Sequence, residues 1–562
     1  MRRPLLVLLS TSLLAACLSE VEVDDPFAGP GRASDARSSI AATDPPPGSD
    51  PSGSPATGAE STASPPAPSS GGPSSAPTSG APPGTPSSTG PGVVTGEPAE
   101  PGELVAVSHE RELRGIWIAT AWAINFPSAA GRAPAQLREE LSRLVDVSAE
   151  AGFNAIFFQV RPEGDAFFRS SHDPWSRFLS GRQGDDPGID PLEELIALAH
   201  PRGIEVHAWL NPYRARVSAS SALASSHMAS RYPQYAYPYG NGTWMDPAAE
   251  PVQQRLLDVI TELVTGYDVD GIHFDDYFYP YPVQGVPFPD DDTFAAYQAS
   301  GGTLSLADWR RENVHTMVQR VHERILELDS SVRFGISPFG IYRPGQPPGI
   351  TGLDAYASLY ADPVRWMEEG WVDYVAPQLY WPTTRTAQAY EPLLTWWTGV
   401  HVELHVFAGN YLSQLGSDSD WTIDEFREQL RISRSMRHRN SRGNIWYQIG
   451  PLLEDRQGIL AVFRDEFHPE PALSPPLVAA RQREVLPPLL EGGDGQPYTI
   501  THRDARPLRG ATVYRDEGDD DWVLVDILGP SADRFDPGPG RWALATVSRD
   551  GVESPGVVIA VP

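Results

Sequence analysis

Acidic side chains stand at the ends of two apolar segments of this sequence. Residues 270–277 read DGIHFDDY and contain the adjacent pair Asp275 and Asp276, while residues 158–163 read FQVRPE and end on Glu163. Cleavage of a glycosidic bond needs a carboxylic acid that protonates the leaving oxygen and a second group that stabilises or attacks the anomeric carbon. Glycoside hydrolysis is therefore the first chemistry that these residues suggest.

Asp275 is the strongest candidate for the centre of such a site. Side chains alternate along a strand, so His273 and Asp275 share one face, and we expect Asp275 to act as nucleophile or electrostatic stabiliser. For the general acid, Glu163 ranks first and Asp276 second. Two structural interpretations stay open: a salt bridge that occupies Glu163, and a buried hydrogen-bonding role for Asp275.

Side chains that could bind a sugar follow the same segments and several similar ones. Amides and hydroxyls pair with sugar hydroxyls, and the flat C–H faces of sugar rings stack on tyrosine and tryptophan. We expect the run Tyr277–Tyr281 to stay partly exposed, because four aromatic side chains outside a strand are hard to bury. The substrate-binding residues predicted from the sequence are Arg161, Asn211, Tyr213, Arg214, His273, Tyr277, Gln378, Tyr380, Trp381 and Asn410.

The elements that must position these residues are repeated pairs of a strand and a helix. Between residues 109 and 487, short runs that are apolar on both faces alternate with amphipathic stretches, which is typical of parallel strands covered by helices. The predicted strands are Leu113–Ala119, Ala155–Val160, Glu205–Leu210, Gly271–Asp275, Val332–Ser337, Tyr374–Leu379, Leu404–Ala408 and Ile445–Ile449. Predicted helices include Ala135–Ala149, Pro191–His200, Val252–Val264, Ala307–Leu328, Thr422–Ser435 and Gln457–Phe467.

Eight such units predict an α/β fold in the form of a closed (β/α)8 TIM barrel. A doubly wound open sheet is the alternative, but no glycine-rich nucleotide-binding turn follows the first strand. In a barrel the C-terminal ends of all strands share one rim, where the candidate residues would meet. Residues 488–562 lack helical periodicity, and their short apolar runs separated by Gly, Asp and Pro predict a small all-β sandwich of fibronectin type III kind.

The composition excludes several other functions. All 43 basic residues are arginines, and 73 acidic residues give a formal net charge of −30. P-loop, Schiff-base and pyridoxal-phosphate chemistry all need a lysine, so no such cofactor is expected. The histidines show no spacing typical of metal ligands, so we expect no metal. An acidic chain without a basic run also makes nucleic acid an unsuitable partner.

The N-terminal residues indicate export and anchoring. In residues 1–17, two arginines precede an apolar run and the sequence LAAC, which resembles the lipobox of bacterial lipoproteins and would place a lipid on Cys17, the only cysteine. Residues 18–108 are rich in Pro, Ser and Gly and predict a disordered tether. We therefore expect a lipid anchor in the cell envelope. Because Leu18 is not acidic, the outer membrane facing the periplasm is the preferred location.

The barrel segment resembles the glycosyl-hydrolase-like family 10. The matching runs are Arg114–Trp117, Phe158–Pro162, His207–Pro212, Asp270–Tyr277, Ile336–Gly340 and Pro377–Tyr380, which fall in order at successive strands. The family includes divisome-localised lipoproteins that act on peptidoglycan strands stripped of peptides. The resemblance thus implies an aminosugar polymer as substrate and the cell-division machinery as a partner. The strand at 270–277 is also similar to that of family 18 chitinases, except that His273 replaces an aspartate and Tyr277 replaces the acid glutamate.

We therefore expect a glycoside hydrolase that acts on peptidoglycan glycan strands. Two alternatives remain: a hydrolase of another extracellular polysaccharide, and a non-catalytic glycan-binding lipoprotein.

Overall fold

The structure is a computed structural model that describes residues 102–417, 421–493 and 495–562. Cys17, the predicted export signal and most of the predicted tether lie outside these residues. In the described ranges, no helix combines the length and the apolar character that a membrane span requires.

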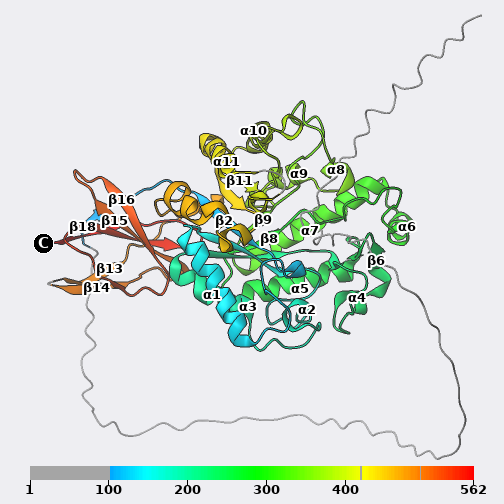
Figure 1. The fold of residues 1–562 in the computed structure, drawn as a ribbon, viewed down its shortest axis with the longest axis horizontal. Coiled ribbons are helices and arrows are strands. Elements are labelled where there is room, and N and C mark those ends of the chain that lie inside the picture. The colour runs from blue at the N-terminus through cyan, green and yellow to red at the C-terminus, as the bar shows by residue number, and fades with distance from the viewer. Residues whose placement is uncertain (1–101, 418–420, 494) are drawn as a thin grey trace, which may run out of the picture. The chain divides into compact units, whose positions relative to one another are not determined.

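Eight parallel strands close into a barrel (Figure 1), which confirms the predicted fold. Around the barrel the strands follow the order β10-β11-β12-β2-β3-β4-β8-β9, and the closing pair β10 and β9 is also parallel. All eight are buried along almost their whole length, because side chains fill the interior and helices cover the outside. The strands are β2 Leu113–Ile118, β3 Ala155–Arg161, β4 Glu205–Leu210, β8 Gly271–Phe274, β9 Arg333–Ile336, β10 Tyr374–Val375, β11 His405–Asn410 and β12 Ser441–Trp446.

Two strands differ from their predicted limits by more than two residues. Strand β10 has only two residues, and Gln378 then makes single bridges to Phe339 and Gly409. Pro377 explains the interruption, since proline has no N–H to give to the ladder. Strand β12 begins at Ser441, before the predicted start at Ile445, because the polar residues 441–444 are buried in the ladder.

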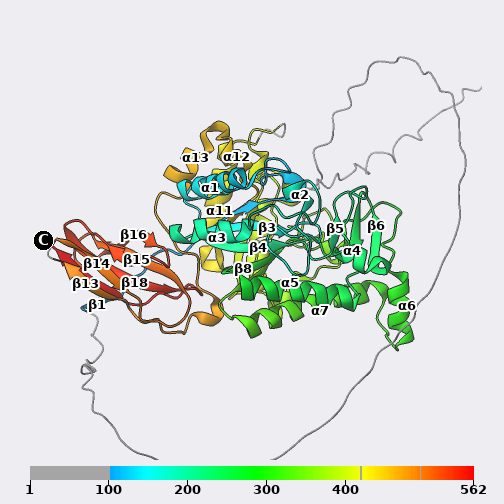
Figure 2. The same ribbon diagram turned by 90° about the horizontal axis from the view of Figure 1, so that it is seen from below.

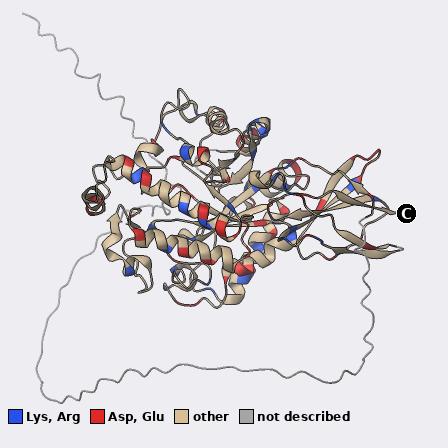
Figure 3. Cartoon of the chain, turned by 180° about the vertical axis from the view of Figure 1, so that it is seen from behind, with Lys and Arg blue, Asp and Glu red and all other residues tan. Residues whose placement is uncertain are grey.

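Amphipathic helices surround the barrel and bury one face each. Helix α1 turns Leu137, Leu141, Leu144 and Val145 inward, as the predicted periodicity requires. Acidic and basic residues lie along the outer faces of the helices (Figure 3), with pairs such as Arg320 and Glu250 at 3.0 Å. The longer helices are α1 Pro134–Glu150, α3 Pro191–Ala199, α5 Glu250–Gly266, α7 Leu306–Leu328, α10 Tyr390–Val400 and α11 Ile423–Ser435.

The helix predicted over Gln457–Phe467 begins two residues later, at Ile459, and changes from α to π winding. Gln457 and Gly458 have φ angles of 56° and 73°, in the left-handed region, so a 3-10 turn at Arg456–Gly458 precedes α13 at Ile459–Val462. The segment Phe463–Phe467 then winds as a π-helix. Left-handed backbone cannot continue a right-handed helix, which is why the helix begins at Ile459 and not at the predicted Gln457.

Short elements extend the C-terminal side of the barrel. Strands β5 Arg214–Arg216, β6 Ala236–Tyr239 and β7 Gly242–Met245 form a small sheet after β4, and helix α6 Asp291–Ala299 follows β8. In Figure 2 these elements and the C-terminal strands lie at opposite ends of the barrel. The insertions therefore border the rim on which the site was predicted.

The C-terminal residues form two antiparallel sheets, as predicted. Ile500, Val513, Leu544 and Ile559 form the apolar cluster of this region. One sheet has the order β1-β19-β18-β15-β16 and the other β13-β14-β17. Strand β1, Leu104–Val105, pairs antiparallel with β19, so the last residues of the predicted tether belong to this sheet. The other strands are β13 Leu489–Gly493, β14 Gln496–Thr501, β15 Leu508–Asp516, β16 Trp522–Leu528, β17 Arg534–Phe535, β18 Gly540–Ser548 and β19 Gly556–Val561.

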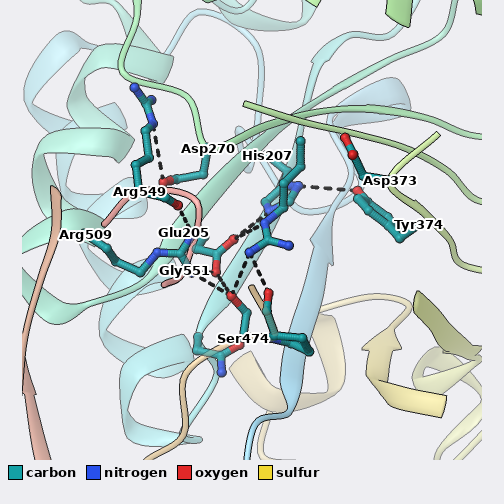
Figure 4. Close-up of polar contacts among 12 residues, drawn as sticks. Glu205, His207, Asp270, Asp373, Tyr374, Ser474, Arg509, Arg549 and Gly551 are labelled. Carbon is teal, nitrogen blue, oxygen red and sulfur yellow. Dashed lines mark hydrogen bonds and ion pairs between the residues drawn. The ribbon is translucent and has the colours of Figure 1, made fainter. Parts of the chain in front are cut away.

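Buried charges join the C-terminal strands to the N-terminal ends of the barrel strands (Figure 4). Glu205, the first residue of β4, is paired with Arg509 of β15 and lies 3.6 Å from Arg333 of β9. Asp270, which precedes β8, lies 3.0 Å from His200 and 4.0 Å from Arg549. We call this network, made of Glu205, Asp270, His200, Arg333, Arg509 and Arg549, the floor cluster.

Candidate active site

Asp275 and Asp276 follow β8 at the C-terminal rim, and both are buried. The two carboxylates have different donors. Asp275 Oδ2 accepts from the Trp209 indole at 3.0 Å and from the Asn211 amide, and its Oδ1 accepts from the backbone N–H of Tyr277 at 3.2 Å. All of these donors are neutral, so they orient the carboxylate without cancelling its charge.

Asp276 is held by a separate pair of neutral groups. Gln378 Nε2 donates to its Oδ1 at 2.9 Å, and the Tyr281 hydroxyl donates to its Oδ2. Gln378 comes from the segment after β10 and also donates to the Ser337 carbonyl at 2.9 Å. The two aspartates are therefore fixed by side chains from different parts of the rim.

Both carboxyls have raised pKa values, and the causes differ. Burial raises the pKa of Asp275 to about 6, against the opposing charge of Arg214. Burial also raises the pKa of Asp276, to about 7, and the neighbouring negative charge of Asp275 adds to this effect. At neutral pH this order favours an ionised Asp275 beside an Asp276 that still holds a proton for part of the time. Such a split is what acid and base roles require.

A chain of amides orients Asp275. Asn211 Oδ1 accepts from Gln159 Nε2 at 2.7 Å and from Arg214 at 2.9 Å, so the Asn211 amide nitrogen must face Asp275. Gln159 Oε1 accepts in turn from the backbone N–H groups of Thr120 and Ala121 at 2.8 and 2.9 Å. Each amide therefore has its orientation set by the next one.

Glu163, the first choice for the acid in the sequence, lies in a different environment. It is buried after β3, where its Oε1 accepts from Arg177 at 2.7 Å and its Oε2 accepts from the backbone N–H of Val217 at 2.8 Å. Burial and the charge of Glu163 raise the pKa of nearby Asp165 to about 7, and Asp165 bonds to Gln183 at 3.2 Å. Arg177 and the backbone of Val217 therefore occupy both oxygens of Glu163, whereas neutral side chains bind those of Asp276.

The predicted binding residues fall into two groups. Asn211, Arg214 and Gln378 contact the aspartate pair directly or through one hydrogen bond. Arg161 pairs with Asp173 at 2.7 Å and donates to the backbone carbonyl of Asn211 at 2.9 Å, whereas Asn410 donates to Gln429 at 2.7 Å, away from the aspartates. Tyr213 is fully buried, and burial raises its pKa. These three side chains are buried and pack around the site.

His273 lies inside the barrel and not on the rim. Its Nε2 accepts from the Trp117 indole at 3.3 Å, and its Nδ1 lies 3.0 Å from the Tyr374 hydroxyl. Tyr374 is in turn 3.3 Å from His207, which lies 3.1 Å from Glu205 in the floor cluster (Figure 4). Burial lowers the pKa of both histidines, so both rings are neutral at ordinary pH.

The aromatic run after β8 is more buried than predicted. Tyr277 stacks on Trp244 with ring centres 5.9 Å apart, and Phe278 packs on Trp366 at 5.1 Å. Tyr279 is also buried, and within the run only Tyr281 keeps partial exposure. The expectation of an exposed run is therefore wrong for three of its four rings, because the insertion at β5–β7 and the outer helices supply aromatic partners.

Other aromatic side chains pack against one another on the rim. Tyr380 stacks on Tyr411 with centres 4.6 Å apart, and Tyr447 lies 5.9 Å from each of them. Trp381 packs against Phe339 at 5.6 Å. Rings of this kind offer flat faces to the C–H groups of a pyranose.

Three contacts of the aspartate pair were not assigned from the sequence. Trp209 could have been found, because it precedes Asn211 by two residues on β4 and so shares its face. Gln159 lies within a motif that was recognised, but its link to Asn211 depends on the pairing of β3 with β4. Nothing in the sequence relates Tyr281 to Asp276, since a loop brings the two together.

A family model described as glycosyl hydrolase-like 10 matches residues 112–423. This range covers more than half of the chain and includes both aspartates, so the chain belongs to the glycosyl hydrolase-like 10 family. The predicted family and the prediction of a glycoside hydrolase are confirmed at this level, and the family implies a polysaccharide substrate.

Curated relatives agree with this assignment. Glycosyl hydrolase YngK of Bacillus subtilis is 34% identical over 429 residues, which cover 73% of this chain and 84% of that protein. Glycosyl hydrolase DigH of Escherichia coli K12 is 35% identical over 353 residues, 57% of this chain and 80% of that one. Among solved structures, the PgaB (BpsB) glycoside hydrolase domain of Bordetella bronchiseptica is 14% identical, covers 59% of this chain and 93% of its own, and has a TM-score of 0.39. This last likeness is too low to support a conclusion about substrate or mechanism.

Proposed function

We propose that this enzyme cleaves the glycan strands of peptidoglycan, with Asp276 as general acid and Asp275 as nucleophile or electrostatic stabiliser. The observation that carries the mechanism is the pair of adjacent buried carboxyls whose pKa values are raised to about 6 and about 7. Neutral donors hold both groups, so each can change its charge during the reaction.

In this mechanism Asp276 gives its proton to the glycosidic oxygen as the bond to the anomeric carbon breaks. The positive charge that develops on the sugar ring is stabilised by the Asp275 carboxylate, either through space or by a covalent bond. Water then supplies a hydroxyl group to the anomeric carbon, and its remaining proton returns to the Asp276 carboxylate. Atoms and charges balance over the cycle, and no cofactor takes part in any step.

Peptidoglycan is the substrate that best fits the remaining features. The rim offers amides and stacked tyrosines, which suit the acetamido groups and the ring faces of an aminosugar polymer. A lipid on Cys17 would hold the enzyme in the envelope where that polymer lies, with the outer membrane facing the periplasm as the proposed location. Recruitment by the cell-division machinery would fit the same picture.

Release of fragments from purified peptidoglycan tests this proposal. The full chain is incubated with sacculi before and after amidase treatment, beside its Asp276→Asn and Asp275→Asn variants. We expect soluble glycan fragments from the parent, more of them after amidase treatment, and at least a hundredfold fewer from either variant. Fragments from a secreted polysaccharide alone would favour the alternative substrate. Glycan binding without any cleavage would favour the non-catalytic alternative.

Lipid anchoring is tested separately. In cells fed a labelled fatty acid, the parent should carry the label and fractionate with outer membranes, whereas Cys17→Ser should lose both properties. Labelled protein in the inner membrane would contradict the proposed location only.

A further inference from the structure

Trp122 is exposed to solvent on the same rim of the barrel as the candidate active site, three strands away from β8. It lies in the 3-10 turn Ala121–Ala123 after β2, on the C-terminal rim, and its side chain is 38% exposed. Within the described residues it is the one aromatic among the large exposed hydrophobic side chains, and no hydrogen bond or ring partner engages its indole. Trp122 and Ala123 have φ angles of 56° and 53°, a left-handed backbone that non-glycine residues adopt at a cost.

The turn that carries Trp122 is rigidly fixed. The backbone N–H of Ala119 donates to Asn125 Oδ1 at 2.8 Å, and the Asn125 amide donates to Gln448, which follows β12. The N–H groups of Thr120 and Ala121 donate to Gln159. Bonds on both sides therefore hold a strained turn, and its effect is to keep one indole exposed.

The same bonds connect this turn to the aspartate pair. Gln159 holds the turn through its Oε1 and orients Asn211 through its Nε2, and Asn211 donates to Asp275. The turn that carries Trp122 is thus connected to Asp275 through two amide side chains, Gln159 and Asn211. On its other side, Gln448 follows Tyr447, which belongs to the stacked tyrosines of the rim.

We propose that Trp122 is a remote sugar subsite, on which one pyranose ring of the glycan stacks while a bond further along the chain is cleaved. The inference rests on the proposed function and deepens it, because it makes the enzyme selective for long strands. A single indole among amides suits a sugar ring, which offers a flat C–H face edged by hydroxyls, better than it suits an apolar protein or lipid surface.

Binding of N-acetylglucosamine oligomers of two to six sugars, measured by calorimetry, tests the subsite. Trp122→Ala should weaken binding of the hexamer about tenfold and leave the dimer unchanged, and Trp122→Phe should restore most of the affinity. The control Trp371→Ala removes a partly exposed indole that precedes β10, at the opposite end of the barrel, and should change neither value. Equal binding of the hexamer by parent and Trp122→Ala, or an equal loss for dimer and hexamer, would overturn the subsite.

Cleavage of peptide-free strands separates this inference from the proposed function. We expect Trp122→Ala to raise KM for long strands about tenfold with little change in kcat. If the parent cleaves strands and Trp122→Ala has the same KM, the subsite is wrong and the function stands. If the parent cleaves nothing but shows the Trp122-dependent binding of the hexamer, the proposed function is wrong and the subsite stands.

Discussion

Strand β8 carries aspartates at both ends, and the two ends have opposite electrostatic surroundings. Asp270, at the start, faces His200 and Arg549, which hold its pKa below the ordinary value although burial acts to raise it. Asp275 and Asp276, at the other end, face neutral donors, and burial raises their pKa values to about 6 and about 7. Aspartate thus interacts with positive charges at the start of β8, whereas its hydrogen bonds at the end of β8 come from neutral groups.

We expect the paired charges of the floor cluster to stabilise the fold and the carboxyls of the rim to take part in proton transfer. At the floor, burial acts to lower the pKa of His200, but the hydrogen bonds that His200 donates to Asp268 and Asp270 raise it to about 9, so these charges persist over the whole neutral range. At the rim, the raised pKa of Asp276, about 7, lets this carboxyl gain and lose a proton near neutral pH. A paired charge cannot easily be given up, whereas a carboxyl held by neutral donors can.

The largest contrast is expected between Asp276→Asn and Asp270→Asn. The rim variant should lose between a hundredfold and ten-thousandfold in strand cleavage without any loss of thermal stability, because it removes the acid and keeps the shape. The floor variant should lose stability and keep its activity at temperatures where it is folded. Midpoints and initial rates measured on both variants check this. Loss of activity by folded Asp270→Asn would break the comparison.

A second large effect is expected at Arg509. Arg509→Met leaves the buried Glu205 without its closest partner, which should lower the free energy of unfolding by about 3 kcal/mol. Arg515→Met, in the same strand, is the control. It breaks an exposed pair with Glu517 at 3.9 Å and a contact with the Trp542 ring at 5.7 Å, and it should change stability by less than about 1 kcal/mol. Urea unfolding measures both variants. An equal loss of unfolding free energy in Arg509→Met and Arg515→Met would show that the buried ion pairs of the floor cluster stabilise the fold no more than an exposed pair does.

The pH dependence of stability should have opposite signs at the two ends. The raised pKa of Asp276 gives stability that is complete below about pH 4 and is lost as the pH rises through about 7. Relative to the parent, Asp276→Asn should therefore gain stability between pH 5 and pH 8, on the order of 2 kcal/mol.

The lowered pKa of Asp270 gives stability that is present above about pH 4 and is lost as the pH falls through the folded-state value. The deficit of Asp270→Asn should accordingly shrink between pH 7 and pH 3. Thermal midpoints of the parent and both variants at these pH values test the two trends. If the stability of Asp276→Asn and that of Asp270→Asn, each relative to the parent, changed with pH in the same direction, the opposite pKa shifts of the two aspartates would be contradicted.

The smallest effect is expected for Tyr281→Phe. This change removes a donor that favours the ionised form of Asp276, so its pKa should rise further and the alkaline limb of the rate profile should move up. We expect a rate loss of about tenfold or less, since one hydrogen bond to a carboxylate contributes about 1.5 kcal/mol. A profile of strand cleavage between pH 5 and pH 9 measures the shift, and an unmoved limb would exclude Tyr281 from this role.

The sequence predicts the barrel well because its strands are apolar on both faces and its helices have regular periodicity. It also predicts Asp275 and Asn211, which follow strand ends and so must share the rim. It does not identify Arg177 as the partner of Glu163, because Arg177 belongs to a short helix whose position depends on the fold. The burial of Tyr277 likewise depends on Trp244, which an insertion brings back over the rim.

The most direct test of the acid role of Asp276 compares two substrates. Asp276→Asn and Asp275→Asn are assayed on an unactivated N-acetylglucosamine oligomer and on an aryl glycoside of the same sugar with a nitrophenol leaving group. A good leaving group needs no proton, so Asp276→Asn should be impaired on the oligomer and nearly normal on the aryl glycoside, whereas Asp275→Asn should be impaired on both. Equal impairment of Asp276→Asn on the two substrates would contradict its assignment as the acid.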